Sequence, residues 1–445
     1  MSTAGYLSLT DDDRDAMLAA IGVASIDELF AQIPDAVRFT RELDVPRALG
    51  ESELVRHLEE LAARNVGASD ELSFLGCGIY DHYVPAIVDT FLGRGEFLTA
   101  YTPYQPEMSQ GVLQAIFEYQ TAICELTGMD VSNASGYDGM TVAADACFVA
   151  KAHTGRSRIV LAETLHPMAR QVVKTYAPGF GMEVVEVAHD GGTIDPARFA
   201  AAADGAAVAI FQQPNVFGCL ENAPALADAA NAGGALSVAH VDLASLGILE
   251  APGAYGCSLA IGEGQSIGNY QSYGGPHYGF LAAKTEFIRR MPGRIVGETT
   301  DLNGERGFVL TLQTREQHIR REKATSNMTT NQTLLALGGL ITLCWLGPEG
   351  LRELGETCAA LTAYAIEKVP LEPVFARPVF KEVAFRTPIP AREVVKRARA
   401  LGVHPGYAIG AEYPGMEDVL LTAFTERRTP ADVERLAGVL EEVTG

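Results

Sequence analysis

Apolar residues in the first part of the chain recur three or four residues apart, as they do on one face of a helix. The first such stretch, residues 9–22, begins with aspartates, which stabilise the positive end of a helix dipole. Two more stretches follow at residues 47–65 and 108–128, and the last is long enough for a core helix. The pattern predicts an N-terminal helical arm over residues 1–65, followed by a domain that contains a long helix.

From Arg158 onward the pattern changes to short apolar runs of strand length, separated by amphipathic stretches. The runs are RIVLAE (158–163), MEVVEVA (182–188), AAVAIFQQ (206–213), LSVAHVD (236–242), CSLAIGE (257–263) and HYGFLAAK (277–284). Such alternation indicates a mostly parallel sheet with helices on both faces, so we predict an α/β fold with a large domain over residues 66–347. Residues 348–445 contain two further strand-like runs between helical ones, which predicts a smaller α+β domain.

Composition narrows the class of protein. The chain has 445 residues, of which 47% are hydrophobic and 20% charged, so it can bury a large core. Its formal net charge of −22 argues against nucleic acid and anionic membrane surfaces as partners. The longest apolar stretch, residues 333–347, falls short of the roughly 20 residues that cross a bilayer. We expect an ordinary globular protein.

The cysteines and the N-terminus bear on the compartment. The seven cysteines are scattered and include no C-x-x-C pair, so we expect neither a disulfide framework nor a metal site. The first residues are acidic and lack the basic and apolar regions of a signal peptide. These features predict a cytoplasmic protein.

A glycine-containing turn precedes a long apolar segment in the middle of the chain. Ser135, Gly136 and Gly139 lie just before a predicted helix, where backbone N–H groups converge and favour a phosphate. The alternative is a plain turn without a ligand, because such turns are common.

Asp242 comes at the end of a predicted central strand, where open α/β folds place ligand contacts. It could equally cap the following turn. In pyridoxal-phosphate enzymes of the aspartate-aminotransferase-like fold, an aspartate on one strand and a Schiff-base lysine on the next hold the cofactor. Starting from Asp242 the counterpart is Gln265, at 265 − 242 = 23, and no lysine lies between Lys174 and Lys284. Glutamine forms no imine, so the expected cofactor pocket lacks its anchor.

Several motifs together resemble a known family. They are FLGCGIYDHYVPAIV (74–88), TAYTPYQPEMSQG (99–111), NASGYDGMTVAADAC (133–147), QQPNVFGCLE (212–221), YGGPHYGF (273–280) and REKATSNMTTNQ (321–332). With the N-terminal YLSLTDDDRDAMLAAIG, they extend the resemblance over nearly the whole chain. The chain resembles the P-proteins of the glycine cleavage system, in the form built from two homologous chains, and specifically the first of the two.

The resemblance implies a fold and an activity. The fold is that of fold type I pyridoxal-phosphate enzymes. The second chain is expected to carry the lysine and the cofactor, while this chain completes the site across an obligate interface, in a heterodimer and a pair of such heterodimers. The enzyme decarboxylates glycine and passes the aminomethyl group to the lipoyl arm of the H-protein.

Two polar clusters are candidates for completing that site. The first lies in an irregular, proline-punctuated loop, whose hydrogen-bonding side chains are Tyr101, Thr102, Tyr104, Gln105 and Glu107. The second comprises Tyr80, His82 and Tyr83. The alternatives are a polar surface loop for the first cluster and a structural histidine for His82.

Other polar residues are given structural roles. His166 lies where this fold often stacks a ring on the cofactor, and we assign it to the degenerate pocket without a catalytic role. His277 is likewise expected to be structural. Arg320, Arg321 and Lys323 form a basic corner that faces either the partner or solvent.

Two rival functions stay open from the sequence. The first is a self-sufficient pyridoxal-phosphate lyase or transaminase that uses a displaced lysine, Lys284 or Lys323. The second is a non-catalytic scaffold that binds a partner through its apolar faces.

Overall fold

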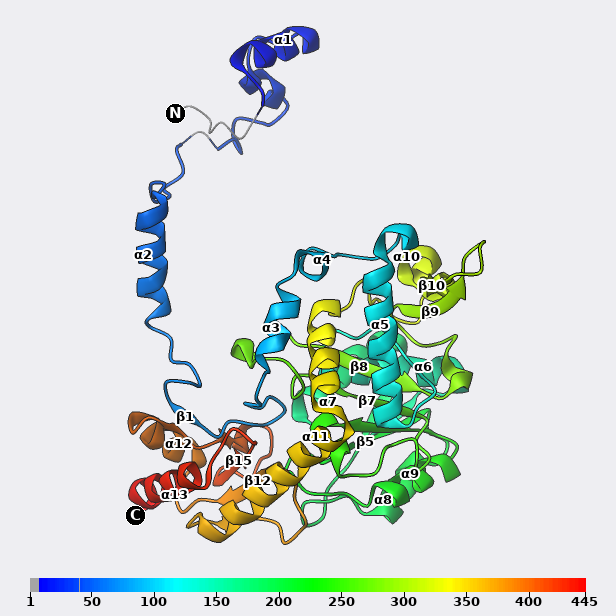
Figure 1. Ribbon diagram of the computed structural model, residues 1–445, viewed down its shortest axis with the longest axis vertical. Coiled ribbons are helices and arrows are strands. Elements are labelled where there is room, and N and C mark those ends of the chain that lie inside the picture. The colour runs from blue at the N-terminus through cyan, green and yellow to red at the C-terminus, as the bar shows by residue number, and fades with distance from the viewer. Residues whose placement is uncertain (1–7, 40) are drawn as a thin grey trace. The chain divides into compact units, whose positions relative to one another are not determined.

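The computed structural model describes residues 8–39 and 41–445, and the chain divides into two units, Met1–Val66 and Gly67–Gly445 (Figure 1). The first unit contains α1 (Asp11–Ile21), the short 3₁₀ helix η1 (Ile26–Phe30) and α2 (Glu51–Ala62). Thr10 and Asp13 form a capping box at the start of α1. None of the unit's described residues, 8–39 and 41–66, is buried, so its helices rest on local interactions rather than on a core.

A seven-stranded sheet organises the second unit. Its strands are β2 (Val131–Ser132), β3 (Arg158–Ala162), β4 (Glu183–Val187), β5 (Val208–Gln213), β6 (Leu236–Val241), β7 (Leu259–Glu263) and β8 (Gly279–Ala283). The spatial order is β2-β8-β7-β6-β5-β3-β4. The strands from β3 to β7 pair in parallel, and β8 and β2 add an antiparallel edge. The predicted mostly parallel sheet is confirmed, and β8 is its antiparallel exception.

Side chains of the sheet alternate between two cores. In β5, Val208 and Ile210 pack into one core and Ala209 and Phe211 into the other, as the period of two along a strand requires. All four are fully buried, and both faces of the strand are apolar. The continuous apolar runs of the sequence therefore reflect a sheet covered on both sides.

Helices cover the two faces. One face is covered by α6 (Gly139–Thr154) and α7 (Pro167–Tyr176). The other is covered by α5 (Pro106–Thr127), α8 (Pro196–Ala203), α9 (Ala223–Ala232) and the first half of α11 (Thr333–Lys368). The short helices α3 (Ala86–Leu92) and α4 (Gly95–Leu98) precede α5, and the hairpin β9 (Ile295–Thr300) and β10 (Arg306–Thr311) leads to α10 (Gln317–Arg320). The segment 74–85 before α3 has no regular secondary structure.

The helix α11 links the sheet to the C-terminal part of the chain. It is kinked at Gly347, which has a φ of 62°, and Pro348 follows. The kink lies where the sequence predicts a domain boundary, after residue 347, and that boundary stays a prediction, because Gly67–Gly445 form one compact unit. Among the described residues, α11 is the one helix long and apolar enough to cross a membrane. That is weak evidence for a span, because its residues Ala336, Leu337 and Leu340 pack into the core beneath the sheet.

A second, four-stranded sheet follows α11, in the order β11-β12-β15-β14. Its strands are β11 (Glu372–Pro373), β12 (Glu382–Arg386), β14 (Tyr407–Ala408) and β15 (Val419–Ala423). The helices α12 (Ala391–Ala400) and α13 (Pro430–Thr444) pack on it around Phe385, Phe424 and Leu436. Beside it, β1 (Leu72–Ser73) pairs in parallel with β13 (Val403–His404), which joins the start of the second unit to its end.

Candidate functional site: a cofactor pocket filled by the chain's own side chains

Two neighbouring strand ends bring Asp242 and Gln265 together. Asp242 directly follows β6, and Gln265 lies two residues beyond the end of β7. Because β6 and β7 are parallel neighbours, both residues lie at the carboxyl edge of the sheet. Ser266 connects them, since its hydroxyl donates to Asp242 Oδ1 at 2.8 Å.

Gln265 is completely buried and bonds to backbone at both ends of its amide. Its Oε1 accepts the N–H of Tyr80 at 2.8 Å, and its Nε2 donates to the carbonyls of Tyr80 at 2.9 Å and Asn269 at 3.0 Å. An amide can accept and donate in this way, whereas a lysine has only donors. The side chain at position 265 therefore clamps the backbone of Tyr80.

Asp242 is paired with a buried lysine from the second sheet. Lys381 precedes β12, is 2% exposed, and its Nζ forms an ion pair with Asp242 Oδ2. The same Nζ contacts His82 Nε2 at 3.0 Å and lies 3.6 Å from the ring centroid of Tyr80. A lysine ammonium has three protons, and the carboxylate, the imidazole and the ring face account for them.

The ion pair sets the charge of Asp242. Burial alone would raise the pKa of Asp242, but the neighbouring Lys381 ammonium lowers it below its ordinary value. Asp242 also accepts from the N–H of Ala244, so the capping role foreseen from the sequence is present as well. The carboxylate is fully used within this chain.

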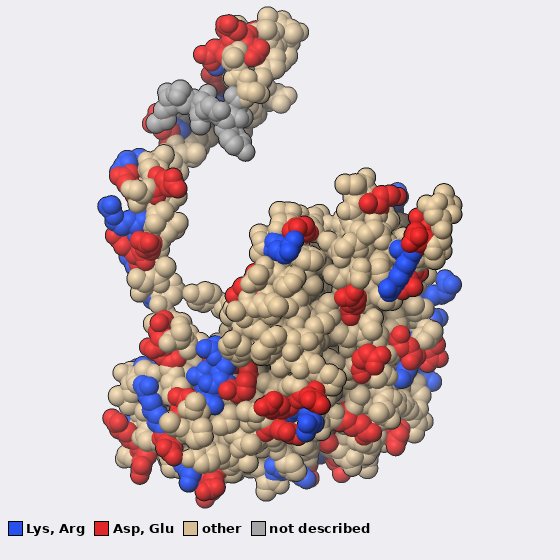
Figure 2. Space-filling model, in the orientation of Figure 1, with Lys and Arg blue, Asp and Glu red and all other residues tan. Residues whose placement is uncertain are grey.

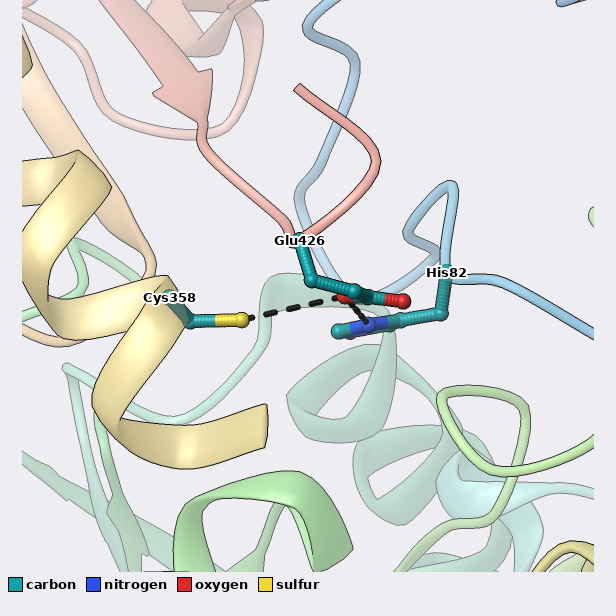
Figure 3. Close-up of side chains that lie close together, drawn as sticks. All are labelled: His82, Cys358 and Glu426. Atoms are coloured by element: carbon teal, nitrogen blue, oxygen red, sulfur yellow. Dashed lines mark hydrogen bonds and ion pairs between the residues drawn. The ribbon is translucent and has the colours of Figure 1, made fainter. Parts of the chain in front are cut away.

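His82 also contacts Glu426, which in turn lies near Cys358. Figure 3 shows these three side chains converging from three segments of the chain. Because His82 Nε2 accepts from Lys381, its proton lies on Nδ1, which donates to Glu426 Oε2 at 2.7 Å. Burial would raise the pKa of Glu426, but the hydrogen bonds from His82 and from the N–H of Tyr83 lower it below its ordinary value. The Sγ of Cys358 lies 3.9 Å from the same carboxylate, and burial raises the pKa of the thiol to about 12.

These three side chains are close enough to resemble a metal site, and their atoms lie within 4.8 Å of one another. Both nitrogens of His82 are already in hydrogen bonds, and a metal ligand must offer a free imidazole nitrogen and a thiolate. The arrangement fits a hydrogen-bonded chain better than a coordination sphere.

Tyr80 fills the space between Lys381 and Glu382. Its hydroxyl donates to Glu382 Oε2 at 2.9 Å, and Glu382 Oε1 accepts the N–H of Cys77 at 2.7 Å. Burial raises the pKa of Glu382 to about 7 and that of Tyr80 well above its ordinary value. His166 meets the same segment through the carbonyl of Cys77, 2.9 Å from its Nε2, and burial lowers its pKa.

The N-terminus of α6 is not an open seat for a phosphate, contrary to the expectation from the sequence. The N–H groups of Met140 and Thr141 donate to Asp138, and the N–H of Gly139 donates to Glu263 Oε2 at 2.9 Å. Two carboxyl groups thus take the donors that an anion would use. Burial raises the pKa of Glu263 to about 8, so this group is protonated in neutral solution.

The other two residues assigned to that seat bond elsewhere. The hydroxyl of Ser135, whose φ is 141°, accepts from the N–H of Gln332 at 3.0 Å and from the amide of Asn331. Gly136 forms an isolated bridge with Gly279. Ser135 therefore holds the segment before α11, and Gly136 pairs with the first residue of β8.

The residues present do not fit a bound pyridoxal phosphate. Position 265 offers no amine, Asp242 already holds a cation, and Asp138 occupies the helix terminus that would face a phosphate. The ring of Tyr80 lies against Lys381, in the space beside Asp242.

The loop before α5 is largely exposed. Tyr101 is 84% exposed, and the side chain of Gln105 also faces outward. Glu107, which the sequence placed in the loop, is exposed too but lies in the first turn of α5, because the helix begins at Pro106. Tyr104 accepts from Arg294 Nη2 at 3.3 Å, and Thr102 is half-buried. The loop is therefore separate from the filled pocket and presents its polar side chains outward.

Tyr83, unlike Tyr80 and His82, reaches the surface. It is 54% exposed and lies beside Trp345, with ring centroids 6.4 Å apart. Both line a cleft of about 650 Å³, which His82, Ser266 and Glu426 also line. In the second predicted cluster, Tyr80 thus lies in the filled pocket, Tyr83 lines the cleft, and His82 contacts both.

The remaining predicted residues lie away from the pocket. His277 is buried and contacts the carbonyl of Gln271. Arg320, Arg321 and Lys323 are exposed, as a solvated corner would be. Lys284 follows β8, whose end at Ala283 pairs with Leu259, so it lies at the amino edge of the parallel strands, opposite Asp242.

Sequence reasoning missed Lys381, Glu382 and Glu426, which supply most of the charge in the pocket. One signal was available. Lys381 and Glu382 open an otherwise apolar strand-like run, and charged residues at a buried strand start require partners.

The fold is shared with pyridoxal-phosphate enzymes. A cysteine desulfurase from Thermococcus onnurineus matches with a TM-score of 0.62 and 16% identity, over 86% of this chain and 98% of that one. A glutamate decarboxylase from Lactobacillus brevis matches with a TM-score of 0.66 and 11% identity, over 93% and 97%. These likenesses define the class by its fold alone: an α/β protein with the fold of the fold type I enzymes.

The family follows from closer similarities. The family model described as glycine cleavage system P-protein matches residues 4–440, and the chain belongs to that family. A probable glycine dehydrogenase (decarboxylating) subunit 1 from Brevibacillus brevis is 47% identical over 99% of both chains, and its counterpart from Geobacillus kaustophilus is 47% identical over 98% of both. The crystal structure of an inhibitor-bound glycine decarboxylase (P-protein) matches with a TM-score of 0.90 and 42% identity, over 98% of this chain and 99% of that one.

Proposed function

We propose that this chain is subunit 1 of a two-subunit glycine dehydrogenase (decarboxylating), and that a homologous second subunit holds the pyridoxal phosphate. The observation that carries the proposal is the filled pocket. Gln265 is bonded to the Tyr80 backbone and Asp242 to Lys381, in a chain whose family uses this cofactor. The cofactor chemistry is therefore assigned to the partner.

The role of this chain is to complete the partner's site. Its surface offers many exposed aromatic and large apolar side chains between α3 and the start of α11 and in the neighbouring loops. They include Tyr83, Ile87, Phe91, Leu98, Tyr101, Tyr104, Met108, Tyr270, Tyr273 and Trp345. In Figure 2 the visible surface around α3, α5 and α11 has few charged side chains. Such a surface is typical of an obligate interface, which buries about 2,000 Å² or more.

The activity follows from the proposed pairing. The complex takes up glycine, releases its carboxyl group as CO2, and transfers the aminomethyl group to the lipoyl arm of the H-protein. The loop with Tyr101, Thr102, Tyr104 and Gln105, together with Glu107 in the first turn of α5, supplies polar groups at the interface. The assembly is a heterodimer, paired into a heterotetramer, in the cytoplasm.

A self-sufficient enzyme with a displaced lysine is less well supported. Lys284 lies at the far edge of the sheet and Lys323 is exposed. Lys381 does reach the pocket, but it contacts Asp242. In this fold an aspartate holds the ring nitrogen, and the imine forms at the other end of the ring. Lys381 therefore occupies the wrong end for an imine.

The test is to omit this chain. The second subunit with H-protein should exchange the glycine carboxyl group with bicarbonate at a fraction of the rate of the complete complex. Undiminished exchange by the second subunit alone would contradict the proposal and favour a scaffold. Visible absorbance of a lysine–cofactor imine in this chain alone, bleached when borohydride reduces the imine, would also contradict it.

A further inference from the structure

The polar groups around the filled pocket bind one short segment of the chain, residues 77–83. Glu382 binds the N–H of Cys77 and the hydroxyl of Tyr80, and Gln265 binds both backbone groups of Tyr80. Further contacts join Cys77 to His166, His82 to Lys381 and Glu426, and Tyr83 N–H to Glu426. Two of these partners belong to the pocket at the strand ends: Gln265 stands at the expected anchor position, and Lys381 is paired with Asp242.

The outer side of the segment is fixed by a second set of contacts. Asp81 is buried and pairs with Arg427 and Arg428, and its carbonyl accepts from the hydroxyl of Thr425 at 2.6 Å. The segment is therefore held on both sides although it forms no helix or strand. Tyr83, the last residue of the segment, lines the 650 Å³ cleft beside Trp345.

Lys381 is the central element of this arrangement because it satisfies two demands at once. It neutralises Asp242, which lies at the carboxyl edge of the large sheet and has no other cation within ion-pair distance among the described residues. It also contacts the side chains of Tyr80 and His82, so the charge balance of the pocket depends on the position of the segment.

We propose that the former cofactor pocket is a socket for residues 77–83, and that Lys381 and Gln265 are positioning residues that hold this segment, with Tyr83, in place for the shared active site. The proposal rests on the proposed function, because it assigns the segment to the site that this chain completes in its partner. It assigns no catalytic step to Lys381 or Gln265.

The test compares Lys381→Met with Lys368→Met. Like Lys381, Lys368 pairs with a carboxylate, here Glu367, and lies over a tyrosine ring, at 5.5 Å, but it does so at the surface. In the isolated full chain, Lys381→Met should speed backbone amide exchange in residues 77–83 by about tenfold or more, because local opening becomes easier. In the complex with the second subunit, kcat for glycine exchange should fall by about tenfold with a smaller change in KM. Lys368→Met should change neither.

A double variant keeps the test valid if Lys381→Met folds poorly. Asp242→Asn/Lys381→Met removes both members of the ion pair and so creates no new unpaired charge, and overall stability should recover. Exchange at residues 77–83 should stay fast and kcat low, because Tyr80 and His82 still lack the ammonium. A double variant with wild-type exchange and wild-type kcat would overturn the proposal, since the pocket would then need only neutrality.

The outcomes separate this inference from the proposed function. Faster exchange with unchanged kcat would overturn the positioning role and leave the proposed function standing. Unchanged exchange in Lys381→Met would overturn the socket itself. If the wild-type chain fails to stimulate its partner, the proposed function fails, whatever the exchange rates of the isolated chain.

Discussion

Replacing Gln265 by lysine returns to the chain the residue type that the fold uses to anchor its cofactor. We expect the variant to form no imine with pyridoxal phosphate and to be less stable. Gln265 Oε1 accepts the Tyr80 N–H at 2.8 Å, and a lysine has no acceptor to replace it. The new ammonium would also lie at a fully buried position, beside the backbone of Tyr80, whose ring already lies against the ammonium of Lys381.

The magnitude follows from these two changes. An unsatisfied buried N–H costs about 1–3 kcal/mol. Burying an additional ammonium costs several kcal/mol more, unless the amine gives up its proton. We expect the free energy of unfolding to fall by about 3–5 kcal/mol, a large part of the roughly 5–15 kcal/mol that natural proteins have. Gln265→Met is the matched control, because it loses the same acceptor but adds no charge.

The assay has two readouts on the full chain. Denaturant unfolding should place the lysine variant below the methionine variant, and both below wild type. Incubation with pyridoxal phosphate followed by borohydride should leave no cofactor attached at position 265, because Tyr80 and Lys381 fill the space and Asp138 holds the helix terminus. A stable imine at one cofactor per chain would refute the reasoning, since it requires an open pocket.

Two further predictions concern other parts of the chain. Burial raises the pKa of Glu263 to about 8 from an ordinary 4.5, so the native state holds a proton that the unfolded state loses between these values, and the free energy of unfolding falls as pH rises through this window. Glu263→Gln should remove this contribution, so the free energy of unfolding of the variant relative to wild type should rise by up to about 1.4 kcal/mol per pH unit between pH 5 and 8. If the free energies of unfolding of the variant and of wild type change with pH in parallel, the pKa of Glu263 is not raised. Tyr101→Phe and Gln105→Ala should lower the exchange rate of the reconstituted complex at unchanged assembly and melting temperature, because both side chains are exposed in this chain; wild-type rates in both would make the loop structural only.

The sheet and the juxtaposition of Asp242 with Gln265 were predictable from the sequence. Consecutive apolar runs of strand length connected by helical stretches give parallel neighbours, and parallel neighbours place their carboxyl ends at one edge. This rule about strand ends needs no knowledge of side-chain contacts. Because it places residue 265 beside Asp242, the absence of a lysine could be recognised at that position from the sequence.

The content of the pocket was not predictable in the same way. Lys381 reaches Asp242 from a different sheet, 381 − 242 = 139 residues later in the chain, and no periodicity connects them. The segment 77–83 has no regular structure, so its path depends on the side chains that bind it. The expected anion seat failed for a simpler reason: Asp138 stands at the N-cap position of α6, and a capping aspartate takes the N–H groups that a phosphate needs.

A pocket of this fold that holds no cofactor leaves the charge of its aspartate to be balanced by the rest of the chain. In a cofactor-bearing relative the aspartate at this strand end faces a ring cation, and without that ring it would be an unpaired buried charge. Here Lys381 supplies the cation, Tyr80 supplies the ring and Gln265 supplies the bonds to the backbone. A companion chain that kept the aspartate but had no cation in place of Lys381 would be expected to lose several kcal/mol of stability. In companion chains without a cofactor, the aspartate and its replacement cation are therefore expected to persist together, and a companion chain that lacks one should also lack the other.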